Sequence, residues 1–133
     1  MALPQPDIAF LDARGLPYTV TEEASMTCVV FSNYALPPGC NVTHADLLIR
    51  LSRGFPDVPP DMWWFSPAVT RYDGRPIPCT EHVENHLGRT WQRWSRHLTQ
   101  GQWRSGTDDL QTYLAMIARE LKRATATVTE AAT

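Results

Sequence analysis

The hydrophobic positions in the first half of the chain alternate as they do in β-strands. Tyr18–Glu22 alternates, and Met26–Phe31 is a denser run of β-forming side chains that suits the middle of a sheet. Ala45–Leu51 and Met62–Phe65 predict two further strands. Because short connections separate these segments, the pattern predicts a four-stranded antiparallel meander and not a βαβ arrangement.

A helix is expected on each side of this strand-forming region. Asp7–Arg14 has an apolar side and is followed by Gly15, a residue that commonly ends helices. Near the C-terminus, Thr107 is the expected N-cap of a helix that crosses the sheet, and Lys122 and Arg123 suit its negative end. The apolar stripe of this helix consists of Leu110, Leu114, Ile117 and Leu121.

The segment between the last strand and the crossing helix gives few structural signals. Phe55–Pro60 is expected to be extended because proline restricts both itself and the residue before it. Residues 66–106 are expected to form a long loop, and loops of that length in a compact domain are usually functional. Its aromatic residues argue against disorder; they are Tyr72, Trp91, Trp94 and Trp103.

The composition limits the classes of protein to which the chain can belong. A chain of 133 residues with 43% hydrophobic and 20% charged residues suits one globular domain, expected over residues 1–123 with a flexible tail over 124–133. The net charge of −2 argues against nucleic-acid binding. The N-terminus does not resemble a signal peptide and no apolar run suits a membrane helix, so a cytoplasmic protein with free thiols is expected. Cys28 is expected in the core, and Cys40 is expected to have no role.

Cys79 is the candidate nucleophile. It lies in Arg75–His82, where prolines are expected to hold a stiff, exposed loop. A thiol that accepts an acyl group must react as the thiolate, which Arg71, Arg75 and a protonated His82 would favour by charge. The alternative is a solvent-facing cysteine without a role.

The tryptophan-rich block after Cys79 has two interpretations that are compatible. Trp91 and Trp94, three residues apart, would share a helical face and fill space beneath the loop. The polar members of the block would then form a cluster beside Cys79; they are Arg93, Arg96 and His97.

A zinc site is the competing interpretation of the same region. Cys79, His82, His86 and His97 have workable Cys/His spacing, but no Cys-x2-Cys pair supports them. We therefore expect neither a metal nor a cofactor.

The order of elements resembles the ubiquitin-conjugating fold, an α+β architecture. Phe55–Pro60 resembles the aromatic-Pro-x-x-Pro-Pro signature of that superfamily, and Cys79 follows Phe55 by 24 residues, where its members carry the catalytic cysteine. Trp103–Leu110 resembles the Trp-Ser-Pro segment before the crossing helix. The closer resemblance, over residues 4–122, is to the prokaryotic ubiquitin-conjugating-like family E, through Pro60–Phe65, Gly88–His97 and Trp103–Gly106.

This resemblance implies a transferase that carries a ubiquitin-like modifier as a thioester on Cys79 and passes it to an amine. The implied partners are the modifier, an adenylating activating enzyme and a metal-dependent deconjugating peptidase, in a bacterial pathway for which a role in antiphage defence is proposed. Arg75, Trp91, Arg93, Trp94, Arg96 and Trp103 are then expected to support the loop or bind partners.

The chain departs from the eukaryotic pattern in three respects. The His-Pro-Asn tripeptide is replaced by Val69–Gly74, the stretch between Cys79 and Trp103 is longer, and the two helices that follow the crossing helix are missing. A group other than that asparagine must therefore stabilise the oxyanion or deprotonate the amine; His82 and His97 are the best candidates, and Asn85 is weaker. These departures favour the alternative of a catalytically inactive adaptor. A small cysteine or zinc-dependent hydrolase ranks last.

Overall fold

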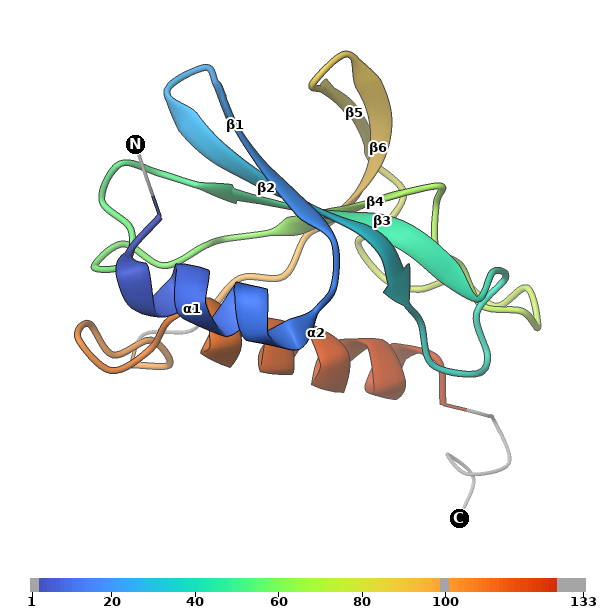
Figure 1. Cartoon of the computed structure of the whole chain (residues 1–133). Coiled ribbons are helices and arrows are strands. Elements are labelled where there is room, and N and C mark those ends of the chain that lie inside the picture. The colour runs from blue at the N-terminus through green and yellow to red at the C-terminus, as the bar shows by residue number, and fades with distance from the viewer. Residues whose placement is uncertain (1–2, 99–100, 127–133) are drawn as a thin grey trace.

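The computed structural model describes residues 3–98 and 101–126, which fold into an α+β structure. A six-stranded antiparallel sheet carries both helices on one face (Figure 1). In chain order the elements are α1 (Gln5–Arg14), β1 (Tyr18–Glu23), β2 (Met26–Ala35), β3 (His44–Leu51), β4 (Trp63–Ser66), β5 (Val83–His86), β6 (Arg89–Trp94) and α2 (Leu110–Ala124).

The sheet has two more strands than the sequence predicted. Its order is β1-β2-β3-β4-β6-β5, so the hairpin of β5 and β6 extends the sheet beyond β4. Residues 66–106 are therefore not one long loop, and that expectation was wrong. The register pairs Trp63 with Trp94 and Phe65 with Gln92. These strands are short and rich in polar residues, so they gave no pattern that the sequence alone revealed.

The two tryptophans of the hairpin lie on opposite faces of the sheet. Trp91 and Trp94 are both fully buried, Trp94 in the cluster beneath the helices and Trp91 in a smaller cluster on the other face. The expected shared helical face was wrong because side chains three apart on a strand point in opposite directions. Each face of the sheet thus receives one tryptophan from β6.

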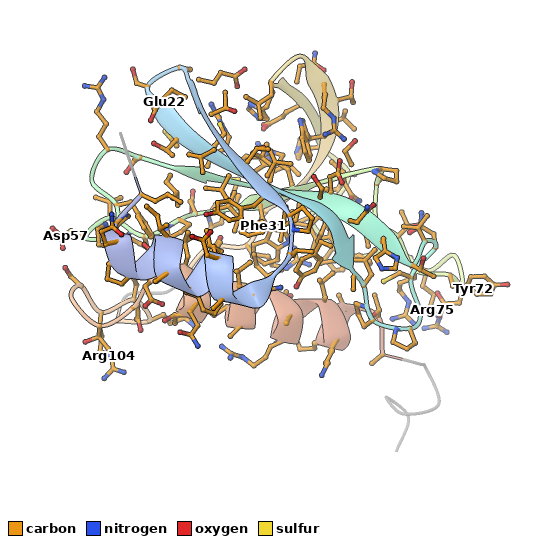
Figure 2. All side chains as sticks on the ribbon, in the orientation of Figure 1. Glu22, Phe31, Asp57, Tyr72, Arg75 and Arg104 are labelled. Atoms are coloured by element: carbon orange, nitrogen blue, oxygen red, sulfur yellow. The ribbon has the colours of Figure 1, made fainter. Side chains whose placement is uncertain are left out.

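The main core fills the space between the sheet and the helices. Phe31 lies near its centre (Figure 2). The stripe predicted for α2 is confirmed as buried; Leu110, Leu114, Ile117 and Leu121 are all at most 3% exposed. On the opposite face, the smaller cluster consists of Cys28, Val30, Leu48, Trp64 and Trp91.

The crossing helix α2 begins two residues later than expected. Asp109, not Thr107, is its N-cap: the Asp109 carboxylate accepts from the Thr112 N–H at 3.1 Å, and the Thr112 hydroxyl accepts from the Asp109 N–H at 3.3 Å. Thr107 lies in a preceding turn that its N–H closes on the carbonyl of Arg104. Lys122 and Arg123 occupy the last turn as predicted.

Helix α1 ends at Arg14, before Gly15, as predicted; Gly15 has φ +72°. The α1 side chain Asp7, which is buried, accepts from the Leu110 N–H at 3.2 Å and thereby links α1 to the start of α2. After α2, Thr125 is buried. The expected flexible tail falls mostly on residues 127–133, which lie outside the described residues. In the described part of the chain, no helix is long and apolar enough to cross a membrane.

Candidate functional site

Cys79 lies exposed in a turn that hydrogen bonds hold on several sides. Its backbone is in the left-handed region, with φ +60°, which non-glycine residues adopt rarely and mostly where surrounding contacts enforce it. The Cys79 carbonyl accepts from the Ser95 N–H at 3.0 Å. The Thr80 hydroxyl donates to the Ile77 carbonyl at 2.8 Å, and the Thr80 N–H donates to Glu81 at 2.9 Å. The thiol is therefore presented by a fixed backbone.

Arg96 connects this turn to helix α2. Its guanidinium donates to the Pro78 carbonyl at 2.9 Å and to the Glu120 carboxylate at 2.8 Å. It also lies over the Trp94 ring, 5.1 Å from the ring centre. The expectation that Arg96 lies beside Cys79 agrees with this geometry, because its bond ends on the residue immediately before the cysteine.

Arg93 supports the other side of the same region. Its guanidinium donates to Glu84 at 2.8 Å and to the Ser95 hydroxyl at 3.0 Å. Its backbone N–H donates to the His82 carbonyl at 2.9 Å. Residues 79–82 therefore run alongside residues 93–95, so that the end of β6 positions the Cys79 segment.

A pocket of about 430 Å³ opens beside the Cys79 turn. Arg75 lines it, and in Figure 2 Arg75 and the exposed Tyr72 lie together at one end of the molecule. The other lining residues are Thr70, Arg71, Gly74, Pro76, Ile77, Thr80, Glu81 and Gln92. Ile77 and Thr80 of the turn line this pocket, whereas Cys79 does not.

Arg71 is occupied with holding the loop. Its guanidinium bonds both carboxylate oxygens of Asp73, at 2.9 and 2.6 Å, and donates to the Ala124 carbonyl at the end of α2. These bonds from Arg71, with that of the Arg75 N–H, hold the pKa of Asp73 well below its usual range. Arg71 therefore anchors the loop to α2.

The two candidate histidines lie in different settings. His82 is exposed on the segment that follows Cys79. His97 is also exposed, and its Nδ1 lies 2.8 Å from an Asp61 oxygen. Within the described residues, neither imidazole is hydrogen-bonded to Cys79. The Asn85 side chain accepts from the Thr90 hydroxyl within the β5–β6 hairpin.

The zinc alternative has no support in the geometry. Among residues 3–98 and 101–126, no group of three His, Cys, Asp or Glu side chains is placed to hold a metal ion. His86, one of the four residues considered, is hydrogen-bonded to Glu84 at 3.1 Å and lies edge-on to Trp64.

Trp91 and Trp103 support the loops around the site. Trp91 donates from its indole to the His86 carbonyl at 2.9 Å. Trp103 donates to the Pro56 carbonyl at 2.8 Å and contacts Phe55 and Tyr113, with ring centres 6.3 and 6.4 Å away. Trp103 thereby joins the proline-rich segment to α2.

The other two cysteines are poor nucleophiles by position. Cys28 is fully buried on β2, and Cys40 is partly buried in the turn that pairs with Arg71. Burial raises the pKa of both thiols, which disfavours the thiolate. Cys79 is the one exposed cysteine among the three.

Sequence reasoning missed Ser95, Thr80 and Glu120, which hold the Cys79 turn directly or through Arg96. Their contribution depends on the pairing of residues 79–82 with 93–95 and on the approach of α2. No local motif marks either contact, so only the folded chain identifies these residues.

A comparison with protein families finds a match over most of the chain. The family model described as Prokaryotic E2 family E matches residues 3–124, which is most of the chain. No curated protein and no solved structure matches. The α+β fold is compatible with that family, which is E2-like and implies a ubiquitin-like modifier and an activating enzyme as partners. This chain belongs to Prokaryotic E2 family E.

Proposed function

We propose that the chain carries a ubiquitin-like modifier as a thioester on Cys79 and transfers it to an amine. The observation that supports this most directly is the exposed thiol on a turn fixed by Ser95, Thr80 and Arg96. A sulfur that exchanges acyl groups between large proteins must be accessible, and a fixed backbone limits the orientations that the partners must match.

The proposed reaction is two successive acyl transfers. The Cys79 thiolate attacks the thioester carbonyl of the modifier on the activating enzyme, a new C–S bond forms, and the enzyme's thiolate leaves. An amine then attacks the new thioester and expels the Cys79 thiolate, while a base accepts the amine proton.

In this proposal, His82 and His97 are the candidates for the proton acceptor and the oxyanion donor. His82 lies on the same segment as Cys79 and is exposed. His97 follows Arg96, the residue that bonds the Pro78 carbonyl. A positioned acid or base of this kind contributes about 100-fold or more to such steps. His82→Ala and His97→Ala should therefore slow aminolysis of a preformed thioester without preventing its formation.

The decisive test is thioester formation with purified components. The cognate modifier, the activating enzyme and ATP are incubated with this chain, and adducts are separated with and without reductant. The wild type should form a reductant-sensitive adduct. Cys79→Ser should give at most a reductant-resistant ester, and Cys79→Ala should give none. Cys40→Ala is the matched control and should behave as wild type. Absence of any reductant-sensitive adduct on the wild type would end the proposal.

A non-catalytic adaptor is the second candidate. Two of the polar groups considered for catalysis are engaged elsewhere, His97 with Asp61 and Asn85 with Thr90. An adaptor would bind the modifier or the activating enzyme without a covalent step. The adaptor hypothesis predicts that Cys79→Ala leaves binding of the partner and conjugation in the complete pathway intact. Reversal of conjugation by the deconjugating peptidase, and any antiphage protection, should also be unchanged.

A further inference from the structure

The hairpin of β5 and β6 leaves one edge of the sheet open next to the segment that carries Cys79. The sheet order ends with β5 on one side and with β1 on the other. Among residues 3–98 and 101–126, no strand pairs with the outer side of β5. An open edge presents backbone N–H and C=O groups that can pair with another extended chain.

The register of the hairpin shows which backbone groups face outwards. The Arg93 N–H donates to the His82 carbonyl at 2.9 Å, and this pair continues the ladder in which Val83 pairs with Gln92. In an antiparallel ladder, hydrogen-bonded and non-hydrogen-bonded pairs alternate. Because position 82 is hydrogen-bonded to β6, Val83 and Asn85 are the non-hydrogen-bonded positions of β5. Their N–H and C=O groups therefore point away from β6, towards the open edge.

The β5 edge lacks the features that usually block such pairing. Native edges are commonly protected by proline, lysine or a bulge, and the paired strand Val83–His86 contains none of them. The Glu84 side chain is turned to the sheet face opposite the helices, where it bonds Trp64 and Arg93. Val83 is β-branched and 63% exposed. The edge therefore offers an incoming strand both backbone groups and an apolar side chain.

The position of Cys79 indicates which kind of chain would pair here. Cys79 precedes Val83 by four residues, on the segment that continues β5 alongside residues 93–95. A chain whose carboxyl end is joined to the Cys79 sulfur, and which then follows the edge, must run antiparallel to β5. Since an extended chain advances about 3.3 Å per residue, its residue opposite Val83 would lie about four positions before that carboxyl end.

We propose that the outer edge of β5 binds the extended C-terminal tail of the ubiquitin-like modifier as an additional antiparallel strand. The tail exchanges main-chain hydrogen bonds with Val83 and Asn85 and places an apolar side chain against Val83. In this mode of recognition the main-chain bonds give affinity, and the side-chain contact gives selectivity. The inference rests on the proposed function, because the thioester on Cys79 brings the tail to this edge.

The test uses a tethered tail, so that it does not require transferase activity. The peptide acetyl-Thr-Val-Thr-Val-Thr-Val-Gly-Gly with a C-terminal cysteamine is joined to Cys79 of the ¹⁵N-labelled full chain as a mixed disulfide. Cys40→Ala removes the partly buried second thiol. Tethering gives an effective concentration of about 1 mM, at which weak pairing is populated. Amide exchange at Val83 and Asn85 should slow about tenfold or more, because their N–H groups become hydrogen-bonded.

Val83→Pro blocks the edge without removing a hydrogen bond of the ladder, because proline is tolerated where the N–H of an edge strand faces solvent. Val20→Pro is the matched control on the other edge strand, β1. There the Ser32 N–H donates to the Pro17 carbonyl, so by the same alternation the Val20 N–H also points outwards. In the tethered protein, Val83→Pro should lose most of the protection at Asn85, and Val20→Pro should keep it.

Two further measurements complete the design. The same peptide with every Thr and Val nitrogen methylated cannot add as a strand, so it should give no protection, and this control requires no variant to fold. In the purified loading reaction, Val83→Pro should lower the rate of thioester formation about tenfold at limiting modifier, and Val20→Pro should match the wild type.

Several results would overturn the proposal. They are unchanged exchange at Val83 and Asn85 after tethering, equal protection at Val20, and protection that survives Val83→Pro or methylation of the peptide. Protection that is present without the peptide and grows with protein concentration would assign the edge to a second copy of the chain instead. If the wild type forms the thioester but the tethered peptide leaves β5 unchanged, the proposed function stands and this inference fails. Absence of the thioester removes the proposed function, whatever the peptide does.

Discussion

At the scale of single residues, two positions with positive φ shape the loops around the candidate site. Cys79 has φ +60° in the turn that presents its thiol. Gly39 has φ +99° where the backbone passes close to the residue after α2; a Cβ built on it would lie 2.6 Å from the Thr125 carbonyl oxygen. Glycine is therefore required at position 39 both for its positive φ and because a Cβ would clash with the Thr125 carbonyl.

Alanine substitutions at Gly39 and at Gly74 separate the effect of positive φ from the effect of the clash. Gly39→Ala should lower the free energy of unfolding by about 2–3 kcal/mol, because the backbone is strained and the Thr125 carbonyl must move. Gly74→Ala is the control, since Gly74 also has positive φ, at +81°, but its added Cβ would meet nothing within 4 Å. It should lose only about 1 kcal/mol. Urea unfolding measures both, and equal losses would contradict the predicted clash.

At the scale of elements, the β5–β6 hairpin is attached by side chains as well as by strand pairing. Glu84 on β5 accepts hydrogen bonds from Trp64 at 2.9 Å, His86 at 3.1 Å and Arg93 at 2.8 Å. The Leu87 N–H at the hairpin turn donates to Glu23 on β1 at 2.7 Å. The hairpin thus contacts β4 and β1 through side chains, and its residue Arg93 bonds the His82 carbonyl in the segment that follows Cys79.

Glu84→Gln tests this attachment and its dependence on pH. Burial raises the pKa of Glu84, but the bonds from His86, Trp64 and Arg93 together outweigh it and lower the pKa overall. The stabilisation is therefore complete above the ordinary pKa of about 4.3 and is lost as pH falls through the lower folded value. The variant should be about 1 kcal/mol less stable at pH 7. The difference should disappear in acid, and a difference that persists there would contradict this account.

The two helices meet at a buried carboxylate. Burial raises the pKa of Asp7, the Leu110 N–H bond opposes the rise, and the charge of Asp109 adds to it. Because the folded pKa is raised, the contribution of Asp7 to stability is greatest below about pH 3.9 and is lost as pH rises through the folded value.

Two substitutions at this position should therefore have opposite effects. Asp7→Asn keeps an acceptor for Leu110 without the buried charge, so at pH 7 it should be as stable as the wild type or more so. Asp7→Ala leaves the N–H unpaired and should lose about 1–2 kcal/mol. Thermal unfolding at pH 4 and 7 compares them. A large loss in the Asn variant at pH 7 would show that the charge itself stabilises the helix start.

At the scale of the whole molecule, the end of α2 is hydrogen-bonded to the loop that leads to Cys79. The Ala124 carbonyl accepts from Arg71 at 2.9 Å, and the buried Thr125 donates from its hydroxyl to the Leu121 carbonyl at 2.7 Å. The sequence placed the domain boundary after residue 123, yet these contacts lie just beyond it.

Truncation tests where the folded unit ends. A chain that ends after residue 126 should keep the stability of the full chain within about 0.5 kcal/mol. A chain that ends after residue 123 loses the Arg71 and Thr125 bonds and should be about 2 kcal/mol less stable. Denaturant unfolding measures this, and equal stability of the two truncated chains would support the boundary at residue 123.

The sequence by itself determined the elements that depend on local pattern. The apolar stripe of α2 could be predicted because its residues recur at helical spacing. The end of α1 could be predicted from Gly15, because few other residues adopt a positive φ as readily. The family resemblance came from residues whose order in the chain carries the information, such as Phe55–Pro60 and Cys79.

Only the tertiary structure decided the rest. The hairpin of β5 and β6 exists because β6 pairs with β4, a contact between residues about 30 positions apart that no local periodicity encodes. That pairing places Trp91 and Trp94 on opposite faces and brings Ser95 to Cys79. Strand pairing and helix packing join distant segments, and single-sequence patterns report only on near neighbours.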